Sequence, residues 1–252
     1  MTDITLRPIG IVRSEYKERN SVPRLGGPAA VEIFPEYQDG LLRLEKHSHL
    51  WVLAWLHQAG RDVLRVIPRG VTERTEENLH GVFAVRSPVR PNPLGLTLAR
   101  ILRVEGPRIE LDRLDFMDGT PVVDLKPYFL SRDAVYAARN EQIGRPEARE
   151  LLRESLAMQA VNFHGESCPE LELAVDIFTD FRAGVLDMME PRELRLTLPL
   201  SRPRLVDAFI GMTRATPGKG TLRFGPENRV RIEYAGGAVD YELLPAGFRR
   251  TP

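Results

Sequence analysis

The sequence predicts two domains of different class, a mainly β first domain closed as a barrel and an α+β second domain. Short strand-like segments with alternating or continuous apolar residues follow one another through the first half of the chain. After Tyr128 the composition shifts to Ala, Glu, Arg and Leu with helical spacing, and strand-like segments return from Glu193 onward. We therefore expect a barrel over residues 1–140 and an α+β domain over residues 147–252, with the boundary between residues 138 and 146.

The first half holds the segments that predict the barrel. Residues 6–13 alternate well enough for a strand, with Pro8 near the start, where a missing N–H is tolerated. Residues 21–28 are typical of a loop, and the leucines of residues 37–44 predict a short helix. Further strands are expected over residues 30–33, 63–67, 81–85, 94–104 and 108–114. A Rossmann fold is excluded, because the chain has neither a G-x-G-x-x-G motif nor a regular alternation of strands and helices.

An almost continuous apolar run, H-L-W-V-L-A-W-L-H, stands at residues 49–57. It has the length of one strand. Because a strand with one solvent-facing side would alternate, the run predicts burial on both faces, inside a barrel or a sandwich.

The second half predicts helices first and strands afterwards. Residues 131–158 have helical spacing interrupted at residues 144–146, and residues 171–183 form a second apolar helix that ends at Gly184. Strands are expected over residues 194–198, 221–224, 230–234 and 238–244. The Gly236-Gly237 pair between the last two strands predicts a hairpin.

Composition indicates an ordinary globular protein of a reducing compartment. Of 252 residues, 42% are hydrophobic and 28% charged, which is enough to build a real core. The single cysteine excludes an internal disulfide. No apolar run approaches the 18 residues of a membrane span, and residues 1–16 carry charges throughout, unlike a signal peptide. We therefore expect a cytoplasmic protein. Its formal net charge is zero, so a nucleic-acid partner would have to bind a local basic patch.

A proline-rich loop is predicted at residues 81–95, G-V-F-A-V-R-S-P-V-R-P-N-P-L-G. Its three central prolines fix φ and stiffen the segment, so that Arg86, Ser87, Arg90 and Asn92 would be presented in fixed positions. Such a loop suits an anionic or planar ligand. The alternative is an exposed connection without a ligand.

Three carboxylates, Asp115, Asp118 and Asp124, fall within the stretch D-F-M-D-G-T-P-V-V-D-L-K-P-Y at residues 115–128. D-G-T-P is a turn signature, and one interpretation is a plain hairpin in which Asp118 satisfies its own backbone. The other is a site, because carboxylates beside apolar strands are costly unless they meet arginines or a ligand.

Four separated motifs resemble the TrmO (TsaA-like) family of S-adenosylmethionine-dependent tRNA methyltransferases over residues 5–130. They are S-H-L-W at 48–51, W-L-H-Q at 55–58, R-S-P-V-R-P-N-P-L-G at 86–95 and D-G-T-P-V-V-D-L-K-P-Y at 118–128, and the start at 8–24 is similar too. The resemblance implies a β-barrel that works as a homodimer. It also implies methylation of the exocyclic nitrogen of threonylcarbamoyl-adenosine beside the anticodon of threonine tRNA.

The resemblance further implies the cofactor residues, which would bind S-adenosyl-L-methionine. They are Pro23, Arg24, Leu25, His57, Gln58, Arg86, Leu96, Asp118, Gly119, Thr120 and Pro121. An arginine such as Arg24 or Arg86 suits the cofactor's carboxylate, and its sulfonium and amino groups suit carboxylate and carbonyl neighbours. Leu25 departs from the expected Gln, so only a backbone contact would survive there.

Three side chains are candidates for the base that takes the proton from the acceptor nitrogen: His49, His57 and Asp118. The sequence does not choose among them, and each histidine has the alternative of a satisfied core residue. Arg90, Asn92, Lys126 and Tyr128 are expected to contact the tRNA substrate.

The second half resembles the FmdE family, named after a component of formylmethanofuran dehydrogenase, over residues 150–245. The resemblance rests on N-F-H-G-E-S-C-P-E-L-E-L-A at 162–174 and V-D-A-F-I-G-M-T-R-A-T-P-G-K-G-T-L-R-F at 206–224. Where that family has His, Gly and Cys, this chain has Glu166, Glu170 and Ala215. Only His164 and Cys168 remain as metal ligands of the usual kind in this half, so we expect no tightly held structural zinc.

Two functions therefore compete. The first is an S-adenosyl-L-methionine-dependent tRNA (adenine-N6)-methyltransferase. The alternative is an accessory or sensor protein that binds S-adenosyl-L-methionine, carries a metal- or pterin-pathway-related second domain, and has no tRNA substrate.

Overall fold

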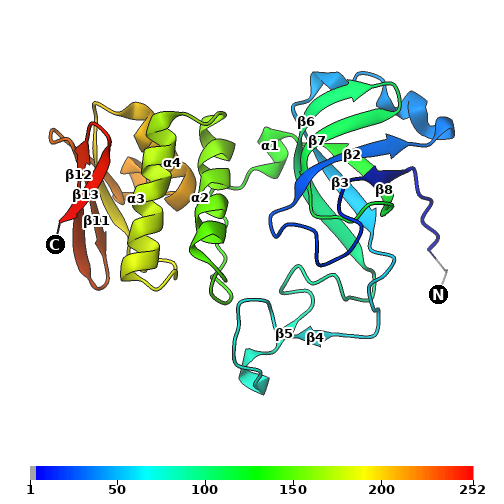
Figure 1. Cartoon of the computed structure of the whole chain (residues 1–252), viewed down its shortest axis with the longest axis horizontal. Coiled ribbons are helices and arrows are strands. Elements are labelled where there is room, and N and C mark those ends of the chain that lie inside the picture. The colour runs from blue at the N-terminus through cyan, green and yellow to red at the C-terminus, as the bar shows by residue number, and fades with distance from the viewer. Residues whose placement is uncertain (1–3, 252) are drawn as a thin grey trace. The chain divides into compact units, whose positions relative to one another are not determined.

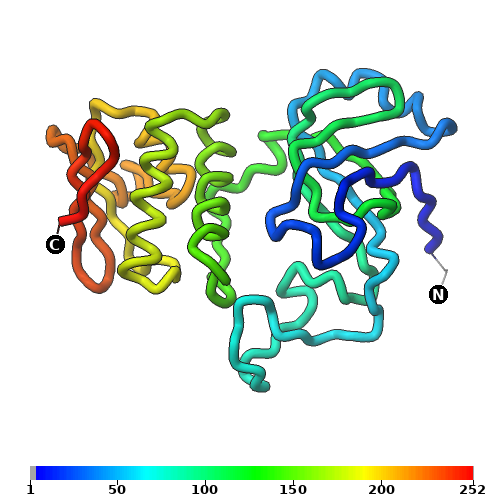
Figure 2. Tube along the Cα trace, in the orientation of Figure 1, coloured from blue at the N-terminus to red at the C-terminus, as the bar shows by residue number. Residues whose placement is uncertain are grey.

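The computed structural model describes residues 4–251 and divides into two compact units. The first contains residues 1–68 and 73–138, and the second contains residues 69–72 and 139–252. The chain runs through the first unit from blue to green and through the second from green to red (Figure 2).

The first unit is a closed barrel of six antiparallel strands in the order β1-β2-β7-β6-β3-β8 (Figure 1). These are β1 (Gly10–Arg13), β2 (Gly27–Ile33), β3 (His49–Trp55), β6 (Leu94–Glu105), β7 (Arg108–Leu114) and β8 (Pro121–Pro127). Their inward side chains, among them Val12, Val31, Leu50, Val52 and Leu111, fill the barrel and are at most 1% exposed. The predicted barrel is confirmed.

The run at residues 49–57 is not buried on both faces. On β3, Leu50, Val52 and Ala54 are fully buried, while Trp51 and Trp55, on the outward face, are only half-buried. A six-stranded barrel has one interior, so every strand has a second face directed outward. The sequence run was continuous because this outward face also carries apolar and aromatic side chains.

Other predictions for the first half were wrong in detail. The expected strand at residues 81–85 is reduced to β5 (His80–Gly81), which pairs only with β4 (Arg65–Val66). The helix expected at residues 37–44 is two 3-10 helices, η1 (Pro35–Leu41) and η2 (Leu44–Lys46), and the predicted loop at 21–28 loses Gly27 and Pro28 to β2. Two further short helices are η3 (Glu76–Asn78) and α1 (Leu130–Asp133).

The second unit is a five-stranded sheet with three helices on one of its faces (Figure 1). Its strands, in the order β10-β9-β11-β12-β13, are β9 (Arg195–Pro199), β10 (Leu222–Gly225), β11 (Arg229–Tyr234), β12 (Gly237–Leu244) and β13 (Gly247–Thr251). The predicted hairpin at Gly236-Gly237 joins β11 to β12. The helices are α2 (Arg149–His164), α3 (Pro169–Val185) and α4 (Pro203–Thr213), and η4 (Pro217–Lys219) is a short turn.

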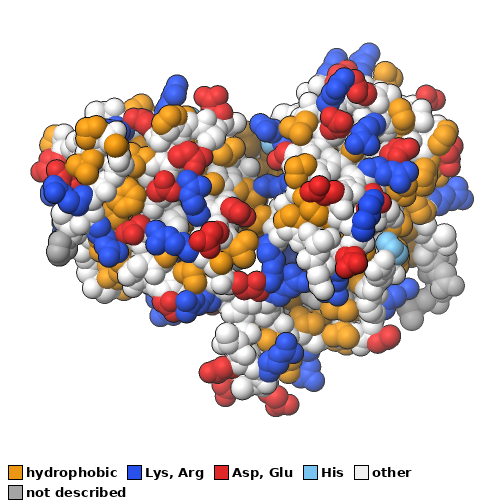
Figure 3. Space-filling model, viewed as in Figure 1, with side chains coloured by type: hydrophobic (Ala, Val, Ile, Leu, Met, Phe, Trp, Pro, Cys, Tyr) orange, Lys and Arg blue, Asp and Glu red, His pale blue; other side chains and the backbone are white. Residues whose placement is uncertain are grey.

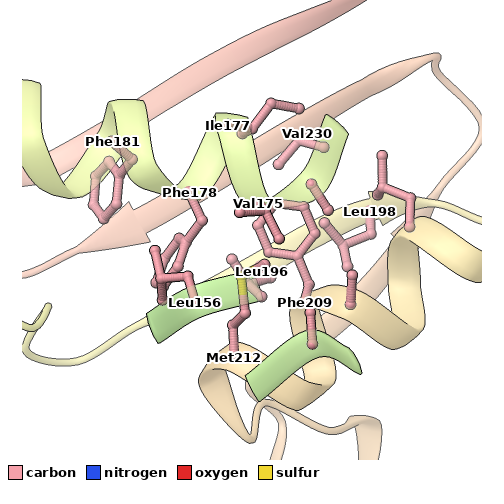
Figure 4. Close-up of a cluster of buried hydrophobic side chains, with 14 of the residues drawn as sticks. Leu156, Val175, Ile177, Phe178, Phe181, Leu196, Leu198, Phe209, Met212 and Val230 are labelled. Atoms are coloured by element: carbon pink, nitrogen blue, oxygen red, sulfur yellow. The ribbon is translucent and has the colours of Figure 1, made fainter. Parts of the chain in front are cut away.

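These helices form two layers, since α3 and α4 contact the sheet and α2 packs on α3 and α4. In the core the Phe178 ring lies 5.9 Å from that of Phe181 and 6.0 Å from that of Phe209, centroid to centroid (Figure 4). The helical segment expected at residues 131–158 was too long at its start, because α2 begins only at Arg149. The helix α4 was not predicted.

Charged side chains of both signs are interspersed over the visible surface (Figure 3). Of the helices in the described part of the chain, none combines the length and the apolar character needed to cross a membrane.

Candidate functional site

One end of the barrel gathers most of the predicted cofactor residues. Antiparallel pairing sets the ends of β1, β3 and β7 beside the starts of β2, β6 and β8. Three loops open at this end, residues 14–26, 56–93 and 115–120, and we call it the loop end. The predicted cofactor residues lie in these loops, except for Pro121 and Leu96, which belong to the first residues of β8 and β6.

The turn at residues 118–120 is fastened to the segment that follows β1. The Asp118 N–H donates to the Tyr16 carbonyl at 2.8 Å, and the Gly119 N–H donates to the Val12 carbonyl at 2.8 Å. Gly119 has a φ of +73°, in the region that favours glycine, and Thr120 is buried. The turn is closed by the Thr120 N–H, which donates to the Met117 carbonyl at 3.2 Å, and it fixes the direction of one carboxylate. The interpretation as a plain hairpin was wrong, because β7 and β8 are not neighbours in the barrel.

The Asp118 carboxylate has two partners. Its Oδ1 accepts from the Ser14 N–H at 3.0 Å, and its Oδ2 lies 2.7 Å from Lys17 Nζ. The Lys17 hydrogen bond, followed by the Ser14 bond, holds the pKa of Asp118 below its ordinary value. Lowering the pKa of a carboxylate makes it a weaker base, so Asp118 suits an electrostatic role better than proton removal.

The segment 23–25 is held beside the end of β7. The Gly26 N–H donates to the Pro23 carbonyl at 3.0 Å. Gly26 has a φ of +81°, and a Cβ there would lie 2.9 Å from the Leu114 carbonyl carbon, so only glycine fits. Pro23 and Arg24 are exposed, and Leu25 is half-buried.

His57 and Gln58 follow β3 directly at the loop end, and both are exposed. Gln58 Nε2 lies 3.4 Å from His57 Nε2, and the Leu56 N–H donates to the Pro93 carbonyl at 2.8 Å. That backbone bond ties the start of this loop to its other end, just before β6.

Arg90 is directed into its own loop. Its Nη2 donates to the carbonyls of Val82 and Val85 at 2.5 and 2.6 Å, and its Nε donates to the Ser87 carbonyl at 2.9 Å. Prolines supply no N–H, so the loop carbonyls take the guanidinium donors instead. Arg90 thus holds the loop in shape, which leaves Arg86 and Asn92 as the polar side chains that the loop presents.

His49, Lys126 and Tyr128 lie toward the opposite end of the barrel. His49 begins β3 and Trp55 ends it, and six steps of about 3.3 Å put the two about 20 Å apart along the strand. Burial lowers the pKa of His49, and Arg100 and Arg113 lower it further against the opposing effect of Asp112. His49 is a neutral imidazole at neutral pH, but it is distant from His57 and Asp118.

A shallow groove of about 570 Å³ lies outside the barrel beside Asp118. Of the predicted site residues, only Asp118 lines it, together with Arg13, Ser14, Arg108 and others. The Ser14 hydroxyl is buried and has no hydrogen-bond partner among the described residues. A buried hydroxyl of this kind costs free energy unless something else satisfies it, which a bound molecule would do.

The two candidate metal ligands of the second unit lie at helix ends. His164 ends α2, and its Nδ1 lies 3.0 Å from Asp207 Oδ2. Cys168 precedes α3 and is 8% exposed within the core of the unit. Among residues 4–251, no three or more His, Cys, Asp or Glu side chains form a group able to hold a metal.

Ser14 and Lys17, which orient Asp118, were not predicted from the sequence. Both stand in the S-E-Y-K stretch just after β1, and Lys17 is one of four lysines against 31 arginines. A rare lysine directly after the first strand could have indicated a partner for a carboxylate. Only the pairing of β1 with β8 shows that this carboxylate is Asp118.

Comparisons with known proteins agree on the first unit. The family model described as "tRNA-methyltransferase O N-terminal domain" matches residues 11–134. An S-adenosyl-L-methionine-binding protein of Archaeoglobus fulgidus is 44% identical over 141 residues, which is 54% of this chain and 98% of that protein. A tRNA (adenine(37)-N6)-methyltransferase of Homo sapiens is 34% identical over 141 residues, 52% of this chain and 32% of that protein.

One relative also matches part of the second unit. A longer Archaeoglobus fulgidus protein, described as a "Probable S-adenosyl-L-methionine-binding protein", is 41% identical over 181 residues, or 68% of this chain. That share is larger than the first unit, so the match continues beyond the barrel. The chain spans just under half of that relative, at 46%.

Proposed function

Since the chain belongs to the tRNA-methyltransferase O N-terminal domain family, we propose that it transfers a methyl group from S-adenosyl-L-methionine to a nitrogen of a tRNA nucleotide. The observation that carries the proposal is that residues 23–25, 57–58, 86 and 118–120 lie in the three connections that open at the loop end of one barrel, with Pro121 at the start of β8. These residues are far apart in the sequence, and they match the family's motifs. The expected compartment is the cytoplasm.

The loop end has suitable partners for the cofactor. Arg24 and Arg86 are cations for its carboxylate, and the Asp118 carboxylate offers negative charge to its amino or sulfonium group. The buried Ser14 hydroxyl, which has no hydrogen-bond partner among the described residues, adds a group that could hydrogen-bond to the cofactor. The cofactor supplies an electrophilic methyl group bound to a positively charged sulfur.

The reaction needs an acceptor nitrogen positioned in line with that methyl group. The nitrogen lone pair forms the new N–C bond while the C–S bond breaks and its electrons remain on sulfur. The nitrogen loses one proton, which needs a base because a urea-like N–H is a poor nucleophile. His57 fits this role best, since Asp118 is committed to Lys17 and His49 lies about 20 Å from the loop end.

The finer proposal is that the acceptor is the exocyclic nitrogen of threonylcarbamoyl-adenosine beside the anticodon. It rests on the family resemblance of residues 5–130 and on the name of the human relative. Mass spectrometry of threonine tRNA from a deletion strain tests it. Loss of one methyl group from the modified nucleoside supports the proposal, and an unchanged nucleoside rules out this acceptor.

We further propose that the protein is a homodimer. The outward faces of β3 and β6 carry Leu53, Trp55, Leu94 and Leu96 side by side, and Leu96 is 42% exposed. An exposed apolar strip of this kind is typical of an interface. Light scattering should give twice the 28.5 kDa chain mass, and a concentration-independent monomer would contradict the proposal.

The second candidate, an accessory or sensor protein, is favoured by the second unit, whose resemblance to the FmdE family remains a prediction. In that case the protein would bind S-adenosyl-L-methionine, and no tRNA nucleoside would change on deletion. The same mass-spectrometric experiment therefore separates the two functions.

A further inference from the structure

Five aromatic rings gather on the outside of the barrel, away from the loop end. They belong to His47, His49, Trp51, Tyr128 and Phe129, and we call them the aromatic surface. The Tyr128 ring centroid lies 6.0 Å from that of Trp51 and 6.5 Å from that of His49, both edge to face. His47 and Phe129 form a second edge-to-face pair at 5.6 Å.

The aromatic surface is not part of the barrel core. The β3 residues that alternate with His49 and Trp51, namely Leu50 and Val52, are fully buried and fill the interior. His49, Trp51 and Tyr128 are half-buried on the outward face, and Phe129 is 43% exposed. Rings that pack mainly on one another leave part of their faces open to a planar ligand.

Cationic side chains surround these rings. Arg100 stands opposite His49 in the β3–β6 register, and Lys126 stands opposite Trp51 in the β3–β8 register. The Arg132 guanidinium lies 5.6 Å from the centre of the Phe129 ring. Within residues 4–251 the Arg100 guanidinium has no ion pair, and the Lys126 side chain is 63% exposed although Asp124 pairs with it at 2.7 Å.

Three carboxylates lie among these cations. Asp124 pairs with Lys126, Asp112 accepts a hydrogen bond from the Arg100 N–H at 2.7 Å, and Asp133 accepts one from the Phe129 N–H at 2.8 Å. One oxygen of Asp112 and one of Asp133 are thus held by the backbone, and both carboxylates keep their charge. The surface offers ring faces beside cations, the combination with which proteins bind single-stranded nucleic acid.

We propose that the aromatic surface binds unpaired nucleotides of an RNA substrate, with bases stacked on Trp51 and Tyr128 and phosphates near Arg100 and Lys126. This inference rests on the proposed function, because it names how the RNA would be held. Paired bases are already stacked within a duplex, so the site selects single strands. Its separation from the loop end means that it binds nucleotides flanking the methylated one.

A binding experiment with the full chain tests the proposal. The probe is an unstructured 12-nucleotide RNA with a fluorescent end, and its anisotropy is measured at low salt, with a duplex of the same sequence for comparison. Trp51→Ala and Tyr128→Ala should each weaken binding of the single strand about tenfold or more, the scale of one lost base stack. Phe224→Ala is the matched control, since Phe224 is 46% exposed but lies on β10 of the second unit, and it should change affinity less than about twofold.

Milder variants guard against misfolding. Trp51→Phe keeps a ring and should retain most of the affinity, while Lys126→Ala should lower the dependence of affinity on salt. The proposal is overturned if Trp51→Ala and Tyr128→Ala bind the single strand like the unmodified protein, or if the duplex binds equally well. Calorimetry with S-adenosyl-L-methionine is run on every variant. If the unmodified protein binds S-adenosyl-L-methionine but not the RNA, only the proposal for the aromatic surface is rejected. If it does not bind S-adenosyl-L-methionine, the proposed function is rejected.

Discussion

The two units of this chain differ in what their polar side chains bind. In the second unit they serve the fold: Arg182 is 6% exposed and donates to the carbonyls of Met188 and Met189 and to Gln142 Oε1, and the Tyr241 hydroxyl donates to Asp180. At the loop end of the barrel, backbone bonds and Arg90 shape the loops, while Arg86 and His57 are exposed. The difference teaches that hydrogen bonds hold Arg182 and Tyr241 within the second unit, whereas those of the loop end hold the loops and leave Arg86 and His57 accessible to a ligand.

The largest effect should come from removing the proposed base at the loop end. His57→Ala should lower the single-turnover rate of methyl transfer to tRNA about a hundredfold or more, the usual contribution of a general base. The affinity for S-adenosyl-L-methionine should change far less. His49→Ala is the matched control, and a larger rate loss in that variant than in His57→Ala would assign the base to the other end of the barrel.

A substitution in the core of the second unit should lower the free energy of unfolding and leave the affinity for S-adenosyl-L-methionine unchanged. Arg182→Ala leaves the Met188 and Met189 carbonyls without this donor and should reduce the free energy of unfolding by about 2 kcal/mol. Arg153 pairs with Glu172 and Asp176 on the surface, where Arg153→Ala should cost under about 1 kcal/mol. Denaturant unfolding measures both, and equal losses would show that the buried arginine has no special role.

The smallest effect concerns the pH dependence set by Lys17. Lys17→Met should raise the pKa of Asp118 toward its ordinary 3.8, although the Ser14 N–H keeps it somewhat lower. Because the folded-state pKa is depressed, the stabilisation is present above about pH 4 and is lost as the pH falls through the folded-state value. The variant should therefore be slightly less stable than the unmodified protein at pH 6, and this difference should vanish at acid pH.

Carbon-13 NMR of the Asp118 carboxyl group follows this titration directly. Lys17→Arg is its matched control, since it keeps the charge. An Asp118 pKa that does not move in Lys17→Met would mean that the ion pair does not form in solution.

The barrel was predictable because local alternation of apolar residues reports strands, and the motifs identified the loops that carry the predicted site. The register of the strands was not predictable. Only the pairing of β3 with β6 and β8 shows that Arg100 stands opposite His49 and Lys126 opposite Trp51. The separation of His49 from His57, by contrast, follows from the length of the predicted strand. Arg90 could not be assigned from sequence either, because its direction depends on which carbonyls the prolines leave without donors.

In the second unit, α4 was missed for a local reason. It has only eleven residues and includes Gly211, so its propensity signal is weak, although Pro203 at its first position is a usual helix start. Packing against α2 and α3 buries Leu205, Phe209 and Met212 and stabilises it. Tertiary contacts of this kind cannot be seen in one sequence.

Isothermal calorimetry of S-adenosyl-L-methionine with the Arg86→Ala variant tests the central claim, that the loop end is the cofactor site. Loss of a charge-assisted hydrogen bond should weaken binding by about 1.5 to 3 kcal/mol. Arg103→Ala, near the end of β6 and thus at the opposite end of the barrel, is the control and should bind like the unmodified protein. Unchanged affinity in Arg86→Ala, or an equal loss in Arg103→Ala, would contradict the assignment of the cofactor to the loop end.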